Sequence, residues 1–130
     1  MLACLLIVFR EVLEAGIVVG ITPEDYAPYG EGPLAGIALQ RHWESQAYAL
    51  GGGDYLAPSQ LVGDFIRNRP STAFGAVLPS YTPGVTLGSL DEALPRYAID
   101  AIREALPAFG KQIKGFDMAD ALLTGVETRT

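Results

Sequence analysis

The sequence predicts a mainly α-helical domain with a few short strands. Apolar residues recur at helical spacing within residues 32–50 and again after Pro95, up to Gly110. The runs that favour β-structure are short, at residues 74–78, 84–87 and 122–130. Most of the regular structure is therefore expected in helices.

Composition limits what the chain can do. Its 130 residues fit one domain, and 49% apolar against 18% charged residues is typical of a folded protein. The net charge of −6 argues against nucleic acid as a partner, because phosphate binding needs clustered Lys and Arg. With Cys4 as the one cysteine and His42 as the one histidine, neither an internal disulfide nor a Cys/His zinc site can form within the chain.

Residues 1–21 differ from the rest and are predicted as an apolar N-terminal helix, set apart from a single domain at residues 22–130. Such a helix would be about 30 Å long, enough to cross a bilayer. Arg10, Glu11 and Glu14 would form one polar stripe along it. Apolar residues contribute about −6 kcal/mol to insertion and three central charges about +9 kcal/mol. The helix is therefore expected either to enter a membrane beside other helices or to dock against a protein partner.

The string Phe9-Arg10-Glu11-Val12-Leu13-Glu14-Ala15-Gly16 resembles the first membrane helix of the high-affinity iron permease family. The resemblance implies that Glu11 and Glu14 are ligands of ferric iron and that Arg10 is their charge partner. Carboxylate oxygens suit Fe(III). Such a site needs ligands from other helices, and nothing after residue 21 resembles a second membrane span. The alternative is that Arg10 and Glu14 form an ordinary i,i+4 ion pair on an amphipathic helix.

The middle of the chain is predicted as helices joined by turns. Residues 22–32 are expected to form an exposed connection. The helix that follows carries a core-facing apolar stripe, and Gly51 to Gly53 let the chain leave it. A short helix is expected over residues 59–66, and a coil over residues 71–88. The stripe consists of Leu39, Trp43, Ala47 and Leu50.

The last third has clear helix signals. Ser89 and Glu92 fit a capping box, and Pro95 separates that short turn of helix from a second helix. Pro107 and Gly110 are expected to end the second helix. Its inner side consists of Ala98, Ile102, Ala105 and Leu106. A solvated face without assigned chemistry consists of Asp100, Arg103, Glu104, Lys111 and Lys114.

Residues 122–130 alternate apolar and polar side chains, which predicts a strand entering a loop. A strand with nothing after it to pair with predicts a truncated domain.

From about Thr22 to Thr130 the chain is similar to a family of bacterial FAD-dependent dehydrogenases, sometimes described as NAD(FAD)-utilising. Five ordered blocks carry this resemblance: residues 32–36, 51–58, 79–85, 104–109 and 123–130. The family's amino-terminal flavin fold and closing glycine-rich segment are absent. The resemblance therefore implies the helical substrate-side insert of an α+β flavoprotein, with a strand re-entering the flavin domain. The isolated segment is expected to be inactive.

The re-entry strand of such a flavoprotein passes near the isoalloxazine ring. The resemblance thus implies flavin-facing roles for Thr124, Gly125, Glu127, Thr128 and Arg129, and it identifies no catalytic residue. The alternative is that these residues are ordinary polar groups of a strand and loop.

Three functions are weighed from the sequence. The first is a fragment of an FAD-dependent oxidoreductase, located in the cytoplasm, that needs a missing flavin-binding domain or another copy of the chain. The second is a membrane protein of the iron permease type, anchored through residues 1–21. The third is a non-catalytic interaction domain, in which residues 1–21 pack as an amphipathic helix against a partner.

Overall fold

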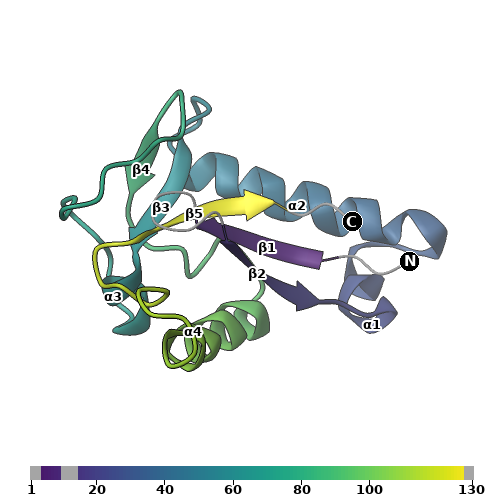
Figure 1. Cartoon of the computed structure of the whole chain (residues 1–130). Coiled ribbons are helices and arrows are strands. Elements are labelled where there is room, and N and C mark those ends of the chain that lie inside the picture. Colours follow the sequence, from purple (N-terminus) through teal and green to yellow (C-terminus); the bar gives the residue numbers. More distant parts are fainter. Residues whose placement is uncertain (1–3, 10–14, 128–130) are drawn as a thin grey trace.

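The computed structural model describes residues 4–9 and 15–127, with side chains described from Ile17 to Val126. Five strands form one sheet in the order β2-β1-β5-β3-β4 (Figure 1). The pair β3–β4 is parallel, and the pairs β1–β2, β1–β5 and β3–β5 are antiparallel. The elements are β1 (Cys4–Phe9), β2 (Ala15–Gly20), α1 (Pro23–Tyr26), η1 (Ala27–Tyr29), η2 (Gly32–Leu34), α2 (Ala35–Leu50), β3 (Ala57–Leu61), α3 (Val62–Ile66), β4 (Val85–Leu87), α4 (Arg96–Gly110) and β5 (Leu122–Glu127).

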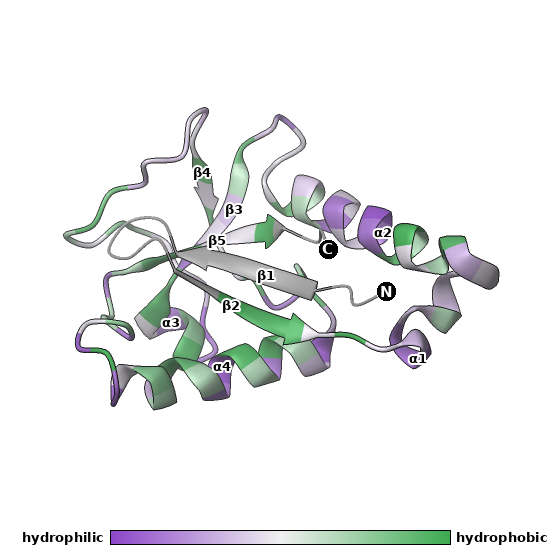
Figure 2. Ribbon diagram, turned by 45° about the vertical axis from the view of Figure 1, so that its right-hand side comes forward, coloured by the Kyte–Doolittle hydropathy of each residue, from purple (hydrophilic) through white to green (hydrophobic). Residues whose placement is uncertain are grey.

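This arrangement is a small mixed α+β domain, which confirms the predicted class. The two long helices, α2 and α4, carry most of the helical residues. Strands β1 and β2 run between these two helices, with α4 along β2 and α2 along β3 and β5 (Figures 1 and 2).

The predicted N-terminal helix is wrong. Residues 4–9 and 15–20 are the antiparallel strands β1 and β2, in a register that pairs Ile7 with Ile17 and Leu6 with Val18. Both segments are rich in branched apolar residues, which lose side-chain freedom in a helix and pack well in a sheet. An amphipathic docking helix is excluded for these two segments by the same pairing. Within residues 4–9 and 15–127, no helix has the length and apolar character needed to cross a membrane.

Helix α2 confirms the predicted apolar stripe. Leu39 and Ala47 are buried, and Trp43 and Leu50 are partly buried against the core. The chain leaves the helix through Gly52 and Gly53, whose φ angles of +106° and +77° lie in the region that glycine adopts without strain. The connection before α2 is more ordered than predicted, because α1, η1 and η2 occupy much of it.

The helix predicted for residues 59–66 is half wrong. Residues 57–61 are strand β3, and only Val62–Ile66 form a helix, α3. The i,i+4 apolar pairs in this stretch indicated a helix, but Ser59, Gln60 and Leu61 pair with β5 instead. Of the two β-leaning runs that follow, residues 85–87 form β4 beside β3, and residues 74–78 form no strand.

Helix α4 confirms the predicted second helix and its inner side. Of the four predicted residues, Ala98, Ile102 and Leu106 are fully buried and Ala105 is partly buried against the core; Ile99, which was not predicted, is fully buried as well. The helix ends at Gly110 as predicted, although Pro107 lies inside its last turn. Ser89 does not begin a helix: its Oγ accepts from the N–H of Asp91 at 3.2 Å, and residues 91–94 form turns.

Strand β5 lies at the centre of the sheet and confirms the predicted C-terminal strand. Its two partners, β1 and β3, both precede it in the chain. Leu123 of β5 is fully buried in a core that also includes Ile17, Leu39, Phe65 and the inner face of α4. Figure 2 shows apolar residues over much of the length of α4. The core thus fixes β5 in place from its buried side.

Candidate functional site

The residues predicted to face a flavin lie on or after β5. Thr124 and Gly125 are in the strand, and Glu127 is its last residue, paired with Leu6 of β1. Thr128 and Arg129 lie outside the described residues, as do Glu11 and Glu14, the predicted iron ligands. The structure therefore brings three of the five predicted flavin-facing residues together on the central strand.

The Thr124 side chain belongs to the contact between β3 and β5. Its Oγ1 lies 3.4 Å from Ser59 Oγ, and the Ser59 hydroxyl donates to the carbonyl of Leu123 at 2.7 Å. A serine hydroxyl has one hydrogen, so Thr124 is the donor to Ser59. Both residues are buried. The Thr124 hydroxyl is thus engaged within the domain.

Gln60 of β3 is a buried amide whose two ends both have partners. Its Nε2 donates to the carbonyl of Arg69 at 2.7 Å, and its Oε1 accepts from the N–H of Leu90 at 2.8 Å. Leaving either end unpaired would cost free energy, because Gln60 is only 1% exposed. The residue therefore ties the segments around Arg69 and Leu90 to the sheet. Its importance was hidden by the helix predicted for this stretch.

Asp64, Arg69 and Ser71 form a second polar cluster. Ser71 Oγ accepts from the N–H of Leu61 at 2.9 Å and donates to Asp64 Oδ2 at 2.7 Å. Arg69 Nε donates to Asp64 Oδ1 at 2.6 Å. The Ser71 hydrogen bond, and then Arg69, lower the pKa of Asp64. With both oxygens occupied, this carboxylate is suited to holding the chain after α3 rather than to transferring protons.

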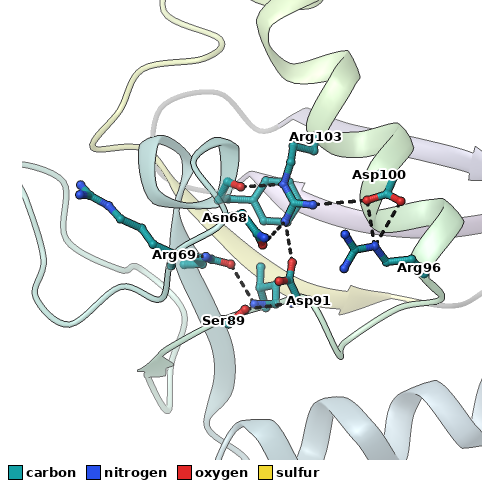
Figure 3. Close-up of polar contacts among 10 residues, drawn as sticks. Asn68, Arg69, Ser89, Asp91, Arg96, Asp100 and Arg103 are labelled. Carbon is teal, nitrogen blue, oxygen red and sulfur yellow. Dashed lines mark hydrogen bonds and ion pairs between the residues drawn. The ribbon is translucent and has the colours of Figure 1, made fainter.

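Arg103 of α4 is the centre of a third cluster (Figure 3). Its guanidinium donates to the carbonyl of Phe65 at 2.8 Å, to Asp91 at 2.5 Å and to Asn68 at 3.3 Å. A longer ion pair of 3.4 Å joins it to Asp100. The guanidinium also lies 4.7 Å from the centroid of the Phe65 ring.

The predicted solvated face is therefore wrong for Arg103, whose side chain is only 17% exposed. A helical wheel places it beside Asp100 and Glu104, but its guanidinium also reaches Phe65 and Asn68, which lie 35 or more residues earlier in the chain. No sequence signal distinguishes this arginine from a solvated one. It links α4 to the end of α3 and to the turn at Asp91.

The glycine-rich loop between α2 and β3 holds two tyrosine rings. Tyr48 donates its hydroxyl hydrogen to the carbonyl of Gly53 at 2.5 Å, and its ring meets that of Tyr55 edge-on, with 5.4 Å between centroids. Thr86 of β4 donates to the carbonyl of Gly51 at 2.6 Å. Tyr55 is 75% exposed. This loop is the most accessible aromatic surface near the sheet.

A separate aromatic group surrounds Trp43 of α2. The ring of His42 lies 4.8 Å from that of Trp43 and 5.2 Å from that of Tyr29. Trp43 Nε1 is buried and has no acceptor within reach in the described part of the chain. Nearby, burial and then the charge of Asp25 raise the pKa of Tyr97 to about 12.

Metal chemistry has no support in the described residues, where no group of three or more His, Cys, Asp or Glu side chains is placed to hold an ion. The three polar clusters join segments of the chain to one another. Tyr48 and Tyr55 in the loop after α2 are exposed, whereas Leu122 to Thr124 of β5 are buried.

Comparison with known proteins adds the family context. Residues 10–130 match the family described as "FAD-dependent protein, C-terminal domain-like". A protein of Clostridium beijerinckii, described only as "Uncharacterized protein", is 51% identical over 116 residues, which are 89% of this chain and 21% of that protein. The chain thus spans about a fifth of the length of the curated relative it matches.

Proposed function

The chain belongs to the family of FAD-dependent proteins, whose C-terminal-domain-like segment it matches over residues 10–130, and we propose that it is the substrate-side part of a flavin-dependent oxidoreductase. The observation that carries this proposal is the position of β5. This strand is held on both sides by β1 and β3 and ends at Glu127. A strand fixed in this way can present its end rigidly to a cofactor bound by another part of a longer protein.

The groups at this end of the sheet fit a flavin. Its ring system is flat and largely apolar, with polar atoms along the edge, so it suits an accessible aromatic ring and uncharged backbone. The Gly51–Tyr55 loop offers the aromatic ring, because Tyr55 is exposed. When bound, the flavin would supply the redox chemistry, while the protein positions it.

Within this proposal each residue of β5 has a distinct task. Thr124, hydrogen-bonded to Ser59, is a positioning residue that holds β5 against β3. Gly125 leaves the backbone free of a side chain. Glu127 is the last described residue, and its carboxylate would accept from hydroxyl or N–H groups of the cofactor. Thr128 and Arg129 would continue this contact.

The domain alone is proposed to be catalytically incomplete. Its relative is about five times longer than the segment it shares with this chain, which leaves room for a flavin-binding part. The partner in this proposal is therefore the remaining part of such a flavoprotein. The proposed reaction class is a dehydrogenation, in which substrate meets the flavin on the side covered by this domain.

A chimeric protein tests the proposal. The matching segment of the Clostridium beijerinckii relative is replaced by this chain, and bound FAD is quantified from the visible spectrum after gel filtration. We expect one FAD per chimera. Glu127→Gln should weaken FAD binding about tenfold, in line with the loss of a charged hydrogen bond. The control Glu31→Gln, at an exposed position of the connection before α2, should bind FAD normally.

Two results would overturn the proposal. A folded chimera without FAD would remove the family role, and equal FAD affinity in the Glu127→Gln and Glu31→Gln variants would remove the role of β5. Circular dichroism of each variant shows whether the domain is folded, so that a loss of FAD is not confused with unfolding.

A further inference from the structure

Tyr55 is a bulky residue held in an uncommon backbone conformation. Its φ angle of +68° lies in the left-handed region, which costs free energy for a residue with a Cβ atom and is mostly occupied by Gly, Asn and Asp. Its side chain gains little burial in return, because 75% of the residue is exposed. An aromatic ring kept accessible at such a position is a sign of recognition rather than of stability.

The loop that carries Tyr55 is fixed by contacts on both sides. The carbonyl of Gly51 accepts from Thr86, the carbonyl of Gly53 accepts from the Tyr48 hydroxyl, and the N–H of Gly53 donates to the carbonyl of Tyr48. The N–H of Ala57 then donates to the carbonyl of Gly84 at 3.1 Å. The Tyr55 ring is therefore presented by an ordered loop, which lowers the entropy lost on binding.

The register of the sheet places this loop on the same side as the end of β5. Strands β3 and β5 are antiparallel, with Ser59 opposite Thr124. The start of β3, two residues after Tyr55, therefore lies at the end of the sheet toward which β5 runs. The loop that carries Tyr55 follows the C-terminal end of α2 (Figure 1), and β3 pairs with β5 from Ser59 to Leu61.

We propose that Tyr55, supported edge-on by Tyr48, is a stacking platform for the isoalloxazine ring of the flavin. This inference rests on the proposed function and names a further binding residue for it. A tyrosine face favours planar aromatic partners in offset stacking. Adenine, the other ring of FAD, is the competing occupant that the experiment separates.

The test uses the isolated chain with lumiflavin, which contains the isoalloxazine ring alone, and with AMP, which contains adenine alone. A stacked tyrosine quenches flavin fluorescence. The fluorescence of lumiflavin should therefore fall to a plateau as the wild-type chain is added. Tyr55→Leu should weaken binding about fivefold, as expected for one lost aromatic pair. Tyr55→Trp should retain binding, and Tyr97→Leu, which removes a partly exposed tyrosine of α4, should match wild type.

A second variant separates recognition from folding. Asparagine is favoured at positive φ, so Tyr55→Asn should keep or raise Tm while weakening lumiflavin binding at least as much as Tyr55→Leu does. A lowered Tm together with unchanged quenching would show a structural role and overturn the proposal. Equal saturable quenching in wild type and Tyr55→Leu would also overturn the proposal. Binding of AMP without binding of lumiflavin would overturn it as well.

The two proposals fail separately. FAD content of the chimera reports on the family role, whereas lumiflavin binding by the isolated chain reports on Tyr55. A chimera that holds FAD while lumiflavin binding ignores Tyr55 would keep the proposed function and remove this inference.

Discussion

Single residues show how the domain keeps its connections ordered. Arg103 contacts Phe65 in α3, Asn68 after that helix, Asp91 in its turn and Asp100 of α4. Gln60 joins three segments through both ends of its amide. Neither residue is part of an apolar core. Each side chain forms hydrogen bonds with backbone groups that have no partner in a helix or strand.

Arg103→Lys should lower the free energy of unfolding by about 2 kcal/mol, because lysine cannot reproduce the planar fork that reaches Phe65, Asn68 and Asp91 together. Arg96→Lys is the matched control, since the Arg96–Asp100 ion pair is more than half exposed on both sides and should contribute within about 0.5 kcal/mol. Urea denaturation monitored by Trp43 fluorescence measures both. Equal stability of the two variants would contradict the role given to Arg103.

The raised pKa of Tyr97 predicts how the stability of the fold depends on alkaline pH. Its folded-state pKa, raised by burial and by Asp25 to about 12, lies above the unfolded value of about 10. The neutral phenol is therefore favoured in the folded state. Its contribution to stability should be complete below pH 10 and disappear as pH rises toward 12.

The check compares wild type with Tyr97→Phe. The phenolate absorbance of wild type should show one tyrosine that titrates late, and this component should be missing from the variant. Asp25→Asn should move the late component to lower pH. Identical titration curves for wild type and Tyr97→Phe would show that the raised pKa does not belong to Tyr97.

The loop between α2 and β3 is the element whose geometry is most demanding. A Cβ atom at Gly51 would collide with the carbonyl oxygen of Leu56. Gly51→Ala should therefore lower the free energy of unfolding by about 2–3 kcal/mol, since the backbone must shift. Gly88→Ala is the control, because a Cβ atom there meets nothing within 4 Å. Thermal unfolding compares them, and equal Tm values would show that the loop is looser than described.

Elements with strong local signals were predictable from the sequence, and those decided by distant partners were not. Helices α2 and α4 show regular apolar spacing, and their buried residues match it. Residues 4–9 and 15–20 are apolar enough to form either a helix or strands. They form strands because they pair with each other and with β5. Ser59 to Leu61 likewise became a strand through pairing with residues more than 60 positions later.

The candidate site was predictable only in part for the same reason. The resemblance to the flavoprotein family identified the strand that became β5, including Thr124, Gly125 and Glu127. It could not reveal that Thr124 is bonded to Ser59, nor that Tyr55 is exposed at a left-handed position, since both depend on tertiary structure. The iron ligands expected at Glu11 and Glu14 lie outside the described residues, and the helix expected over residues 1–21 is replaced by strands at residues 4–9 and 15–20.

At the scale of the whole molecule, the domain combines its own core with an exposed aromatic loop at Tyr55. The core joins α4, α2 and the sheet, so the segment has the contacts expected of an independently packed unit. The exposed Tyr55 lies in the loop after α2, and β5 is the central strand of the sheet. In our proposal, this domain faces a flavin held by another part of the protein.

The stoichiometry of FAD tests this account most directly. The purified chain and the chimera with its Clostridium beijerinckii relative are each mixed with excess FAD, desalted and examined for flavin absorbance that is bleached by dithionite. The account predicts one flavin per chimera and less than about 0.1 per isolated chain, because weak ring stacking alone does not survive desalting. A bleachable flavin bound one-to-one by the isolated chain would contradict it.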